Sequence, residues 1–258
     1  MDHKDAARLL AEAEANCSPI PPLTQLFPDL TEQDSYQIQH IRAAWRKESG
    51  EVQTGWKIGL TSAGAQRQMQ VDKPDFGYLF DTMQVPDGGS CSMKTMTAPK
   101  AEGELAFYIN KTLRGPGVTV EDVLAATEYV QPAIEIADTR IADWKIKLED
   151  TIADNGSAKG YVLGGRKVPV QQVDLLLTGM TLRCNGKLLS SGTTAEVLTN
   201  PARAIAVMVD GLARQGLALE AGSIVLTGSV TAPVLVSAGD TITASFYGMG
   251  DVSVTFTE

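Results

Sequence analysis

The sequence contains few cysteines, no run of basic residues and no long apolar segment. Its three cysteines, Cys17, Cys91 and Cys184, form no Cys-x-x-Cys pair, which argues against a disulfide framework and a structural zinc site. The 22 Lys and Arg residues face 31 Asp and Glu residues, giving a net charge of −9. Duplex nucleic acids are therefore unfavourable partners, since their binding needs clustered cations. The longest apolar stretches, such as residues 205–209, are far shorter than the roughly 20 residues of a membrane helix.

The first residues, Met1 to Asp5, lack the basic and apolar regions of a secretory signal, so a cytoplasmic location is expected. The 258 residues are 43% hydrophobic and 21% charged, which is typical of a globular protein with a real core. We expect one domain over residues 1–258, with a helical segment at 1–50 followed by a β-rich region at 51–258.

Hydrophobic spacing and capping residues predict helices over residues 4–15, 31–50, 119–130 and 201–216. Thr31 and Asp34 resemble a capping box with Asp in place of Glu. Asn200 and Pro201 are typical of a helix start.

Short β-branched and apolar runs bounded by glycine predict strands. They lie at residues 55–60, 77–85, 102–109, 133–137, 181–189, 223–227, 234–237, 241–247 and 252–256. Asn185 and Gly186 indicate a hairpin turn within residues 181–189. This order of elements predicts an α+β fold with a mixed sheet.

Three glutamates are the strongest chemical signal. Glu102 and Glu104 lie two residues apart in a predicted strand, so their side chains share one face. A solvated strand face would explain that pair alone. Glu135, however, lies between apolar residues, where a carboxylate is unfavourable unless it is paired or bound to a metal. Three carboxylates without nearby His or Cys favour Mg²⁺ or Mn²⁺ over zinc.

Six motifs occur in an order that resembles the 2-keto-4-pentenoate hydratase and 4-oxalocrotonate decarboxylase group of the fumarylacetoacetate hydrolase superfamily. They are residues 55–62 (GWKIGLTS), 74–77 (PDFG), the Glu102 and Glu104 pair, Glu135 in its apolar strand, 154–157 (DNGS) and 226–229 (LTGS). The resemblance extends from about residue 30 to the C-terminus. It implies a mixed β-roll with peripheral helices and self-association into a homo-oligomer.

The resemblance also implies roles for single residues. Glu102, Glu104 and Glu135 match the metal ligands of the group, and Lys57 and Asp75 match its acid/base and substrate-positioning groups. A metal beside Lys57 would lower its pKa and suit it to proton transfer. Lys57 could instead be a surface lysine and Asp75 a turn residue.

The remaining candidates bind substrate. Thr227 and the Gly228 backbone match the loop that receives the substrate carboxylate, and Ser157 belongs to the DNGS motif. Lys159 stands where a small or neutral residue is usual, and residues 199–201 (TNP) replace a common Gly-His-Pro. Lys159 is a candidate for binding a second substrate carboxylate, with a solvent-facing lysine as the alternative.

Histidine is scarce as well. The hydrolase branch of the superfamily uses a His-assisted water, yet this chain has only His3, near the terminus, and His40, beside the apolar stripe of a helix. Structural or solvated roles are expected for both, which disfavours hydrolase activity.

Residues 140–144 (RIADW) and 150–155 (DTIADN) resemble the hydratase branch more than the decarboxylase branch. The leading hypothesis is a metal-dependent lyase of aromatic catabolism that adds water to a 2-hydroxy-2,4-dienoate. One alternative is decarboxylation of a 2-oxo-3-enedioate, and another is a structural subunit that supports a partner enzyme of the pathway. Each of these functions requires a small-molecule site or a protein partner. None of them requires nucleic acid or a membrane.

Overall fold

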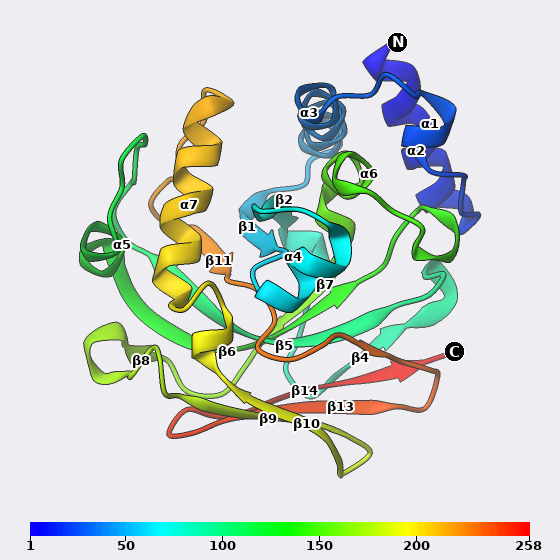
Figure 1. The fold of residues 1–258 in the computed structure, drawn as a ribbon. Coiled ribbons are helices and arrows are strands. Elements are labelled where there is room, and N and C mark those ends of the chain that lie inside the picture. Colours follow the sequence, from blue (N-terminus) through cyan, green and yellow to red (C-terminus); the bar gives the residue numbers. More distant parts are fainter.

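Two β-sheets and a set of helices make up the computed structural model, which describes residues 1–258 (Figure 1). The helices are α1 (His3–Asn16), α2 (Leu23–Leu26), α3 (Glu32–Glu48), α4 (Ala63–Met69), α5 (Val120–Ala126), α6 (Leu148–Ala153) and α7 (Pro201–Arg214). Short 3₁₀ turns are η1 (Asp81–Met83), η2 (Met93–Thr95), η3 (Ala142–Trp144), η4 (Asn155–Ser157), η5 (Val170–Gln172) and η6 (Thr194–Glu196).

The first sheet follows the order β2-β1-β11-β5-β6-β7-β3, with β12 added to β5 and β8 to β6. Its strands are β1 (Gln53–Gly59), β2 (Asp75–Phe80), β3 (Gln84–Val85), β5 (Lys100–Ile109), β6 (Thr127–Ala137), β7 (Ala158–Leu163), β8 (Val168–Pro169), β11 (Ile224–Leu226) and β12 (Val234–Leu235). Pairs β1–β11 and β3–β7 are parallel and the others antiparallel, so the sheet is mixed.

The second sheet follows the order β10-β9-β13-β14-β4. Its strands are β4 (Gly89–Ser92), β9 (Gly179–Cys184), β10 (Lys187–Thr193), β13 (Thr241–Phe246) and β14 (Gly250–Thr257). The two sheets share one large apolar core. The predicted α+β fold with a mixed, curled sheet and peripheral helices is confirmed (Figure 1).

Gly103 shows how this packing turns two glutamates in one direction. A side chain at Gly103 would meet Met180 and Ala244 of the second sheet, with the nearest atom 3.0 Å away. Side chains alternate along β5, so Glu102 and Glu104 point to the opposite face of the first sheet. The second sheet thus covers one face of β5, and the glutamates occupy the other.

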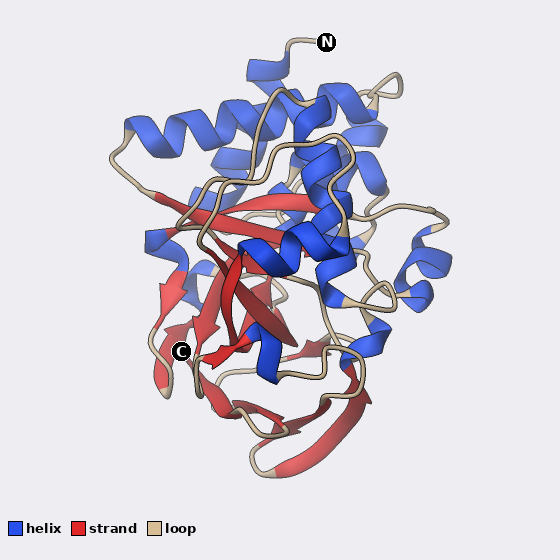
Figure 2. Cartoon of the chain, turned by 90° about the vertical axis from the view of Figure 1, so that its left-hand side faces the viewer, coloured by secondary structure: helices blue, strands red, loops and turns tan.

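The N-terminal helices have an apolar cluster of their own on one side of the strands (Figure 2). Leu10 of α1 and Ile38 of α3 pack there with Ile141 and Ala153, which come from the β-rich region. The predicted capping box at the start of α3 is present, since Thr31 and Asp34 exchange side-chain to backbone hydrogen bonds. The cluster ties α1 and α3 to the segment around α6.

Some predicted boundaries are wrong. The strand expected over residues 77–85 is interrupted by η1, which separates β2 from β3. The helix expected over residues 119–130 ends at Ala126, and β6 begins at Thr127. The sequence from Thr127 to Val130 is rich in β-branched and aromatic residues, and pairing with β5 determines its conformation. Thr127 also donates its hydroxyl to the carbonyl of Val123, which closes the helix end.

Two turns contain residues with positive φ angles. Asn185 and Gly186 have positive φ angles of 51° and 79° and join β9 to β10, which confirms the predicted hairpin. Thr199 also has a positive φ of 67°. A β-branched residue is strained there, because its side chain crowds the backbone.

None of the helices is sufficiently long and apolar to cross a membrane.

Thr199→Gly is expected to raise the free energy of unfolding by about 1 kcal/mol, because relief of strain exceeds the entropy that glycine adds to the unfolded chain. Thr193→Gly is the matched control, since Thr193 is also exposed but has an ordinary φ of −118°. It should lower stability by roughly 0.5–1 kcal/mol. Urea unfolding of both variants measures the difference, and a loss of stability at both positions would contradict the strain argument.

Candidate active site

Strand register brings the predicted site residues together. Glu102 of β5 lies directly opposite Glu135 of β6. Lys57 of β1 is paired with Leu226 of β11, which is paired in turn with Ala106 of β5. Residues directly opposite in neighbouring strands share a face, so the glutamates and Lys57 converge across four adjacent strands.

A cavity of about 560 Å³ opens beside this cluster. Four of the predicted residues line it: Lys57, Asp75, Glu102 and Ser157. Glu104 and Glu135 are more deeply buried, at 0% and 1% exposure, and do not form its wall. The cavity therefore combines the ammonium of Lys57, the carboxylates of Asp75 and Glu102 and the hydroxyl of Ser157.

Lys57 is buried and held from two sides. Its Nζ donates a hydrogen bond to the carbonyl of Gly156 over 2.7 Å and lies 3.1 Å from Oε1 of Glu135 as an ion pair. A side chain at Gly156 would meet the Lys57 side chain at 3.0 Å, so glycine leaves room for this approach. The alternative of a surface lysine is excluded.

Burial lowers the pKa of Lys57, but the carboxylates of Glu135 and Asp75, followed by those of Glu102 and Glu104, outweigh it and raise the pKa above its usual range. A neighbouring metal was expected to lower this pKa. Among the protein groups alone the direction is the opposite, because acidic neighbours stabilise the ammonium form. Lys57 is thus held in its charged form.

Burial raises the pKa of all three glutamates. The effect is strongest at Glu104, where Glu135 and Glu102 add repulsion and the pKa lies well above its ordinary range. Glu104 accepts one hydrogen bond, from the backbone N–H of Gly228 over 2.8 Å. Ionisation of these carboxyl groups is therefore unfavourable unless a further cation is present.

The chemistry of these groups fits a hard divalent cation. Oδ1 of Asp75 and Oε1 of Glu104 are buried without a hydrogen-bond donor, and Oε1 of Glu135 has only its ion pair with Lys57. Carboxylate oxygens with unmet demand for positive charge are typical ligands of Mg²⁺ or Mn²⁺. The side chains nevertheless do not form a ready group of three acidic ligands around one point, so the ligand set stays a prediction.

Asp75 is positioned by a residue that sequence reasoning missed. The hydroxyl of Thr151 in α6 donates to Oδ2 of Asp75 over 2.9 Å, while Oδ1 is buried without a hydrogen-bond donor. A side chain at Gly59 would collide with this carboxylate. Thr151 belongs to the DTIADN motif, so the motif held the signal although its role was not recognised.

The loop expected to receive a substrate carboxylate is arranged differently. The hydroxyl of Thr227 donates to the carbonyl of Leu105 over 3.0 Å, and the N–H of Gly228 is taken by Glu104. Neither residue lines the cavity, whereas Ser229 and Thr231 do. The structure therefore does not support direct substrate binding by Thr227 and Gly228, and it places Gly228 as a support for Glu104.

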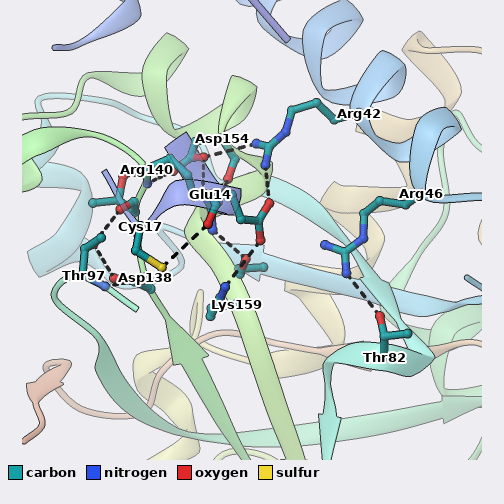
Figure 3. Close-up of polar contacts among 12 residues, drawn as sticks. Glu14, Cys17, Arg42, Arg46, Thr82, Thr97, Asp138, Arg140, Asp154 and Lys159 are labelled. Atoms are coloured by element: carbon teal, nitrogen blue, oxygen red, sulfur yellow. Dashed lines mark hydrogen bonds and ion pairs between the residues drawn. The ribbon is translucent and has the colours of Figure 1, made fainter. Parts of the chain in front are cut away.

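The structure contradicts the prediction for Lys159. Its Nζ lies 3.6 Å from Oε1 of Glu14 on the side of the N-terminal helices, and it does not line the cavity (Figure 3). Lys159 follows the left-handed turn η4, so strand alternation cannot be counted through Ser157 to place it. Its side chain is 15% exposed, and its ion pair with Glu14 directs it away from the cavity.

Other cavity residues were missed because nothing in their motifs marks them. Lys100 and Arg67 line the cavity and make no ion pair, and the Nζ of Lys100 lies 3.6 Å from the ring centroid of Trp144. The two histidines lie elsewhere. His3 pairs with Asp34 and His40 with the hydroxyl of Tyr78, each over 2.8 Å.

Comparison with known proteins connects this geometry to one family. Residues 50–257 match the family model described as Fumarylacetoacetate (FAA) hydrolase C-terminal. A 2-hydroxyhexa-2,4-dienoate hydratase of Comamonas testosteroni is 42% identical over 251 residues, which are 96% of this chain and 95% of the relative. A 4-oxalocrotonate decarboxylase of Pseudomonas putida is 37% identical over 250 residues, 97% and 95% of the two chains.

A solved structure shows the same fold. The 4-oxalocrotonate decarboxylase from Pseudomonas putida G7, complexed with magnesium and adipate, superimposes with a TM-score of 0.96 at 34% identity. The match covers 99% of this chain and 98% of that one. The chain therefore belongs to the fumarylacetoacetate hydrolase family and is a lyase of its hydratase and decarboxylase group.

Proposed function

We propose that the protein is a hydratase that adds water to a 2-hydroxy-2,4-dienoate and forms a 4-hydroxy-2-oxo acid during the breakdown of aromatic compounds. The observation that carries the proposal is the placement of Lys57, a buried ammonium at the wall of the cavity with Asp75 beside it. The similarity to the Comamonas testosteroni hydratase and the hydratase-like motifs at 140–144 and 150–155 support this activity over its neighbours.

The overall reaction requires two proton movements and one addition. In a 2-hydroxypenta-2,4-dienoate, the proton of the 2-hydroxyl leaves and a proton is added at C5, which gives a 2-oxo-3-enoate. Water then adds its oxygen at C4 and a proton at C3. The protein must therefore supply an acid near the far end of the diene and hold a water near C4.

Lys57 suits the first requirement because the surrounding carboxylates keep it protonated. The Gly156 carbonyl and Glu135 fix the direction of its Nζ. Asp75 suits the second requirement, since Oδ1 is free to accept a hydrogen bond from water while Thr151 holds Oδ2. The hydroxyl of Ser157, buried at the cavity wall without a partner, is a further group that can orient substrate.

We further propose that Glu102, Glu104 and Glu135 hold one Mg²⁺ or Mn²⁺. The unmet carboxylate oxygens support this, and the related decarboxylase was solved with magnesium. When bound, such an ion attracts electron density from the carboxylate and C2 oxygens of the substrate and stabilises the negative charge that develops on them. The Gly228 N–H holds Glu104 in place for this role.

Decarboxylation of a 2-oxo-3-enedioate is the second candidate, and one observation favours it. Arg67 lines the cavity without an ion pair, and Lys100 lines it near Glu102, so either can receive a second substrate carboxylate. Lys159, which was expected to do so, lies outside the cavity. A role as a structural subunit for a pathway enzyme requires none of these cavity groups. Self-association remains part of the proposal.

Removing one buried charge tests the metal site. In the presence of a chelator, Glu104→Gln should raise the free energy of unfolding by at least about 1 kcal/mol, because it removes a carboxyl group whose pKa is raised by burial and repulsion. A raised pKa means that ionisation disfavours folding as pH rises above the usual glutamate range, so the gain should be larger at pH 8 than at pH 5.

The same variant should lose most of the stabilisation that Mg²⁺ gives the wild-type chain. Glu128→Gln, at the exposed end of β6, is the matched control and should change neither property. Thermal unfolding with chelator and with Mg²⁺ at both pH values provides the measurement. Equal Mg²⁺ stabilisation in both variants would contradict the proposed ligand.

Replacing the proton donor tests Lys57. Lys57→Met should lower kcat by about 100-fold or more, since general acid catalysis typically contributes 10²–10⁴-fold. Lys57→Arg should not restore activity, because the planar guanidinium differs from an ammonium in shape and in the directions of its hydrogen bonds. Stopped-flow absorbance of the dienol measures turnover, and Mg²⁺-dependent stabilisation checks that the metal site is intact. Near-normal turnover in Lys57→Met would remove Lys57 from the mechanism.

A substrate panel separates the candidate functions. The purified chain should hydrate 2-hydroxypenta-2,4-dienoate and release no CO₂ from a 2-oxo-3-enedioate. Loss of dienol absorbance, product mass and CO₂ release are followed in parallel. Faster CO₂ release than hydration would identify a decarboxylase, and no turnover of either substrate with Mg²⁺ or Mn²⁺ would favour the structural subunit.

A further inference from the structure

The turn η4 lies between the active-site cavity and the N-terminal helices and has an unusual backbone. Asn155, Gly156 and Ser157 are all left-handed, with φ angles of 59°, 61° and 56°. Two of them are not glycine, so the conformation is unfavourable unless the surroundings enforce it. Gly156 and Ser157 line the active-site cavity, whereas Asn155 lines a separate cavity of about 190 Å³ under α1 and α3.

This turn supports the proton donor directly. The carbonyl of Gly156 accepts the hydrogen bond from Lys57 over 2.7 Å. The Asn155 side chain exchanges hydrogen bonds with the backbone of Tyr78, at 2.7 Å from its N–H and 3.0 Å to its carbonyl. Tyr78 belongs to β2, the strand that begins with Asp75. The position of both catalytic candidates therefore depends on the shape of η4.

The residue before the turn is a fully buried anchor. Asp154 has 0% exposure and accepts hydrogen bonds from Nε of Arg140 at 2.5 Å, the hydroxyl of Thr139 at 2.9 Å and Nη1 of Arg42 at 3.2 Å. Arg140 also donates to the Asp154 carbonyl, so side chain and backbone are both held. The two motifs that resemble the hydratase branch meet in this Arg140–Asp154 pair.

Arg42 extends the anchor to the N-terminal helices (Figure 3). It comes from α3, and its Nη2 donates to Oε2 of Glu14 in α1 over 2.8 Å. Lys159 contacts the other oxygen of the same carboxylate. A continuous series of charge-assisted contacts thus joins α1, α3, Asp154 and the turn that holds Lys57.

We propose that Asp154 and Arg42 are positioning residues that hold η4 in its left-handed shape and thereby orient Lys57 toward the substrate. The expected effect on catalysis rests on the proposed function. The expected effect on the shape of η4 rests only on the contacts of Asp154 and Arg42. A network that only stabilised the fold would affect folding but not the geometry around Lys57. The two roles can therefore be separated by experiment.

The test compares Arg42→Met with Arg46→Met. Arg46 lies one turn further along α3 and lines the same second cavity, but it pairs with Glu51 and does not touch Asp154. Arg42→Met should lower kcat on the order of 10- to 100-fold with little change in KM, because displacement of a reacting group affects the chemical step most. Arg46→Met should leave both unchanged.

A readout independent of activity is amide hydrogen exchange. The Ser157 N–H donates to the Asp154 carbonyl at 3.0 Å and the Tyr78 N–H to Asn155, so both should exchange faster in Arg42→Met but not in Arg46→Met. Unchanged exchange in Arg42→Met would overturn the inference whatever Lys57 does. Faster exchange together with a fully active Lys57→Met variant would instead overturn the proposed role of Lys57.

A double-mutant cycle completes the test. If Arg42 acts through Lys57, then Arg42→Met should have almost no further effect on kcat in the Lys57→Met background. An equal loss in both backgrounds would show an independent structural role and contradict the inference. Should Arg42→Met not fold, Thr139→Val removes one hydrogen bond to Asp154 without changing charge, and roughly a 3- to 10-fold loss of kcat is then expected.

Discussion

An excess of carboxyl groups over cations is the constraint on which the site depends. Four carboxyl groups surround the ammonium of Lys57, and those of Asp75, Glu104 and Glu135 are buried. Such a cluster is unfavourable to folding, because each charge loses hydration and the acidic groups repel one another. The fold tolerates it because strand pairing fixes Glu102 opposite Glu135 and because Gly228 and Thr151 each donate one hydrogen bond to a carboxylate. The carboxylate oxygens that have no hydrogen-bond donor can still bind a cation.

The same excess of carboxyl groups explains why Lys57 differs from the expectation based on a metal alone. A buried lysine without acidic neighbours loses its proton easily, whereas this lysine is stabilised in the charged form by Glu135 and Asp75. In the protein alone its proton is therefore held more tightly than that of a solvated lysine. An ion bound to the glutamates would weaken that hold, so the acid strength of Lys57 is coupled to the charge state of the site. The proposed metal and the proposed proton donor are thus parts of one electrostatic unit.

The sequence predicted most of what depends on local chemistry and alternation. The shared face of Glu102 and Glu104, the burial of Glu135 and the hairpin at Asn185 and Gly186 follow from period-two alternation and turn preferences. The end of α5 was missed because pairing with β5 outweighs local helix preference over residues 127–130. No pattern along the chain could place a long side chain that follows an irregular turn, and Lys159 was misplaced for that reason.

Other residues were not predicted because their roles depend on contacts that form only in the folded chain. Thr151 is an ordinary helix residue until Asp75 is placed beside it, and Arg140 is an ordinary cation until Asp154 is buried against it. The motifs that contain them resemble the hydratase branch, yet a sequence motif does not show which atoms are in contact. The contacts show why the spacing matters: α6 ends one residue before Asp154, so a single short segment reaches Asp75, Arg42 and Lys57 in turn.

The N-terminal helices belong to this arrangement although the family match begins at residue 50. Besides Arg42, α3 provides Gln39, whose amide donates to the carbonyls of Phe76 and Ile152, each over 2.8 Å. Those carbonyls belong to the residues that directly follow Asp75 and Thr151. One helix thus fixes the backbone on both sides of the Asp75–Thr151 hydrogen bond and, through Asp154, the turn beneath Lys57. The geometry of the candidate active site is therefore determined jointly by the β-rich region and the helices that precede it.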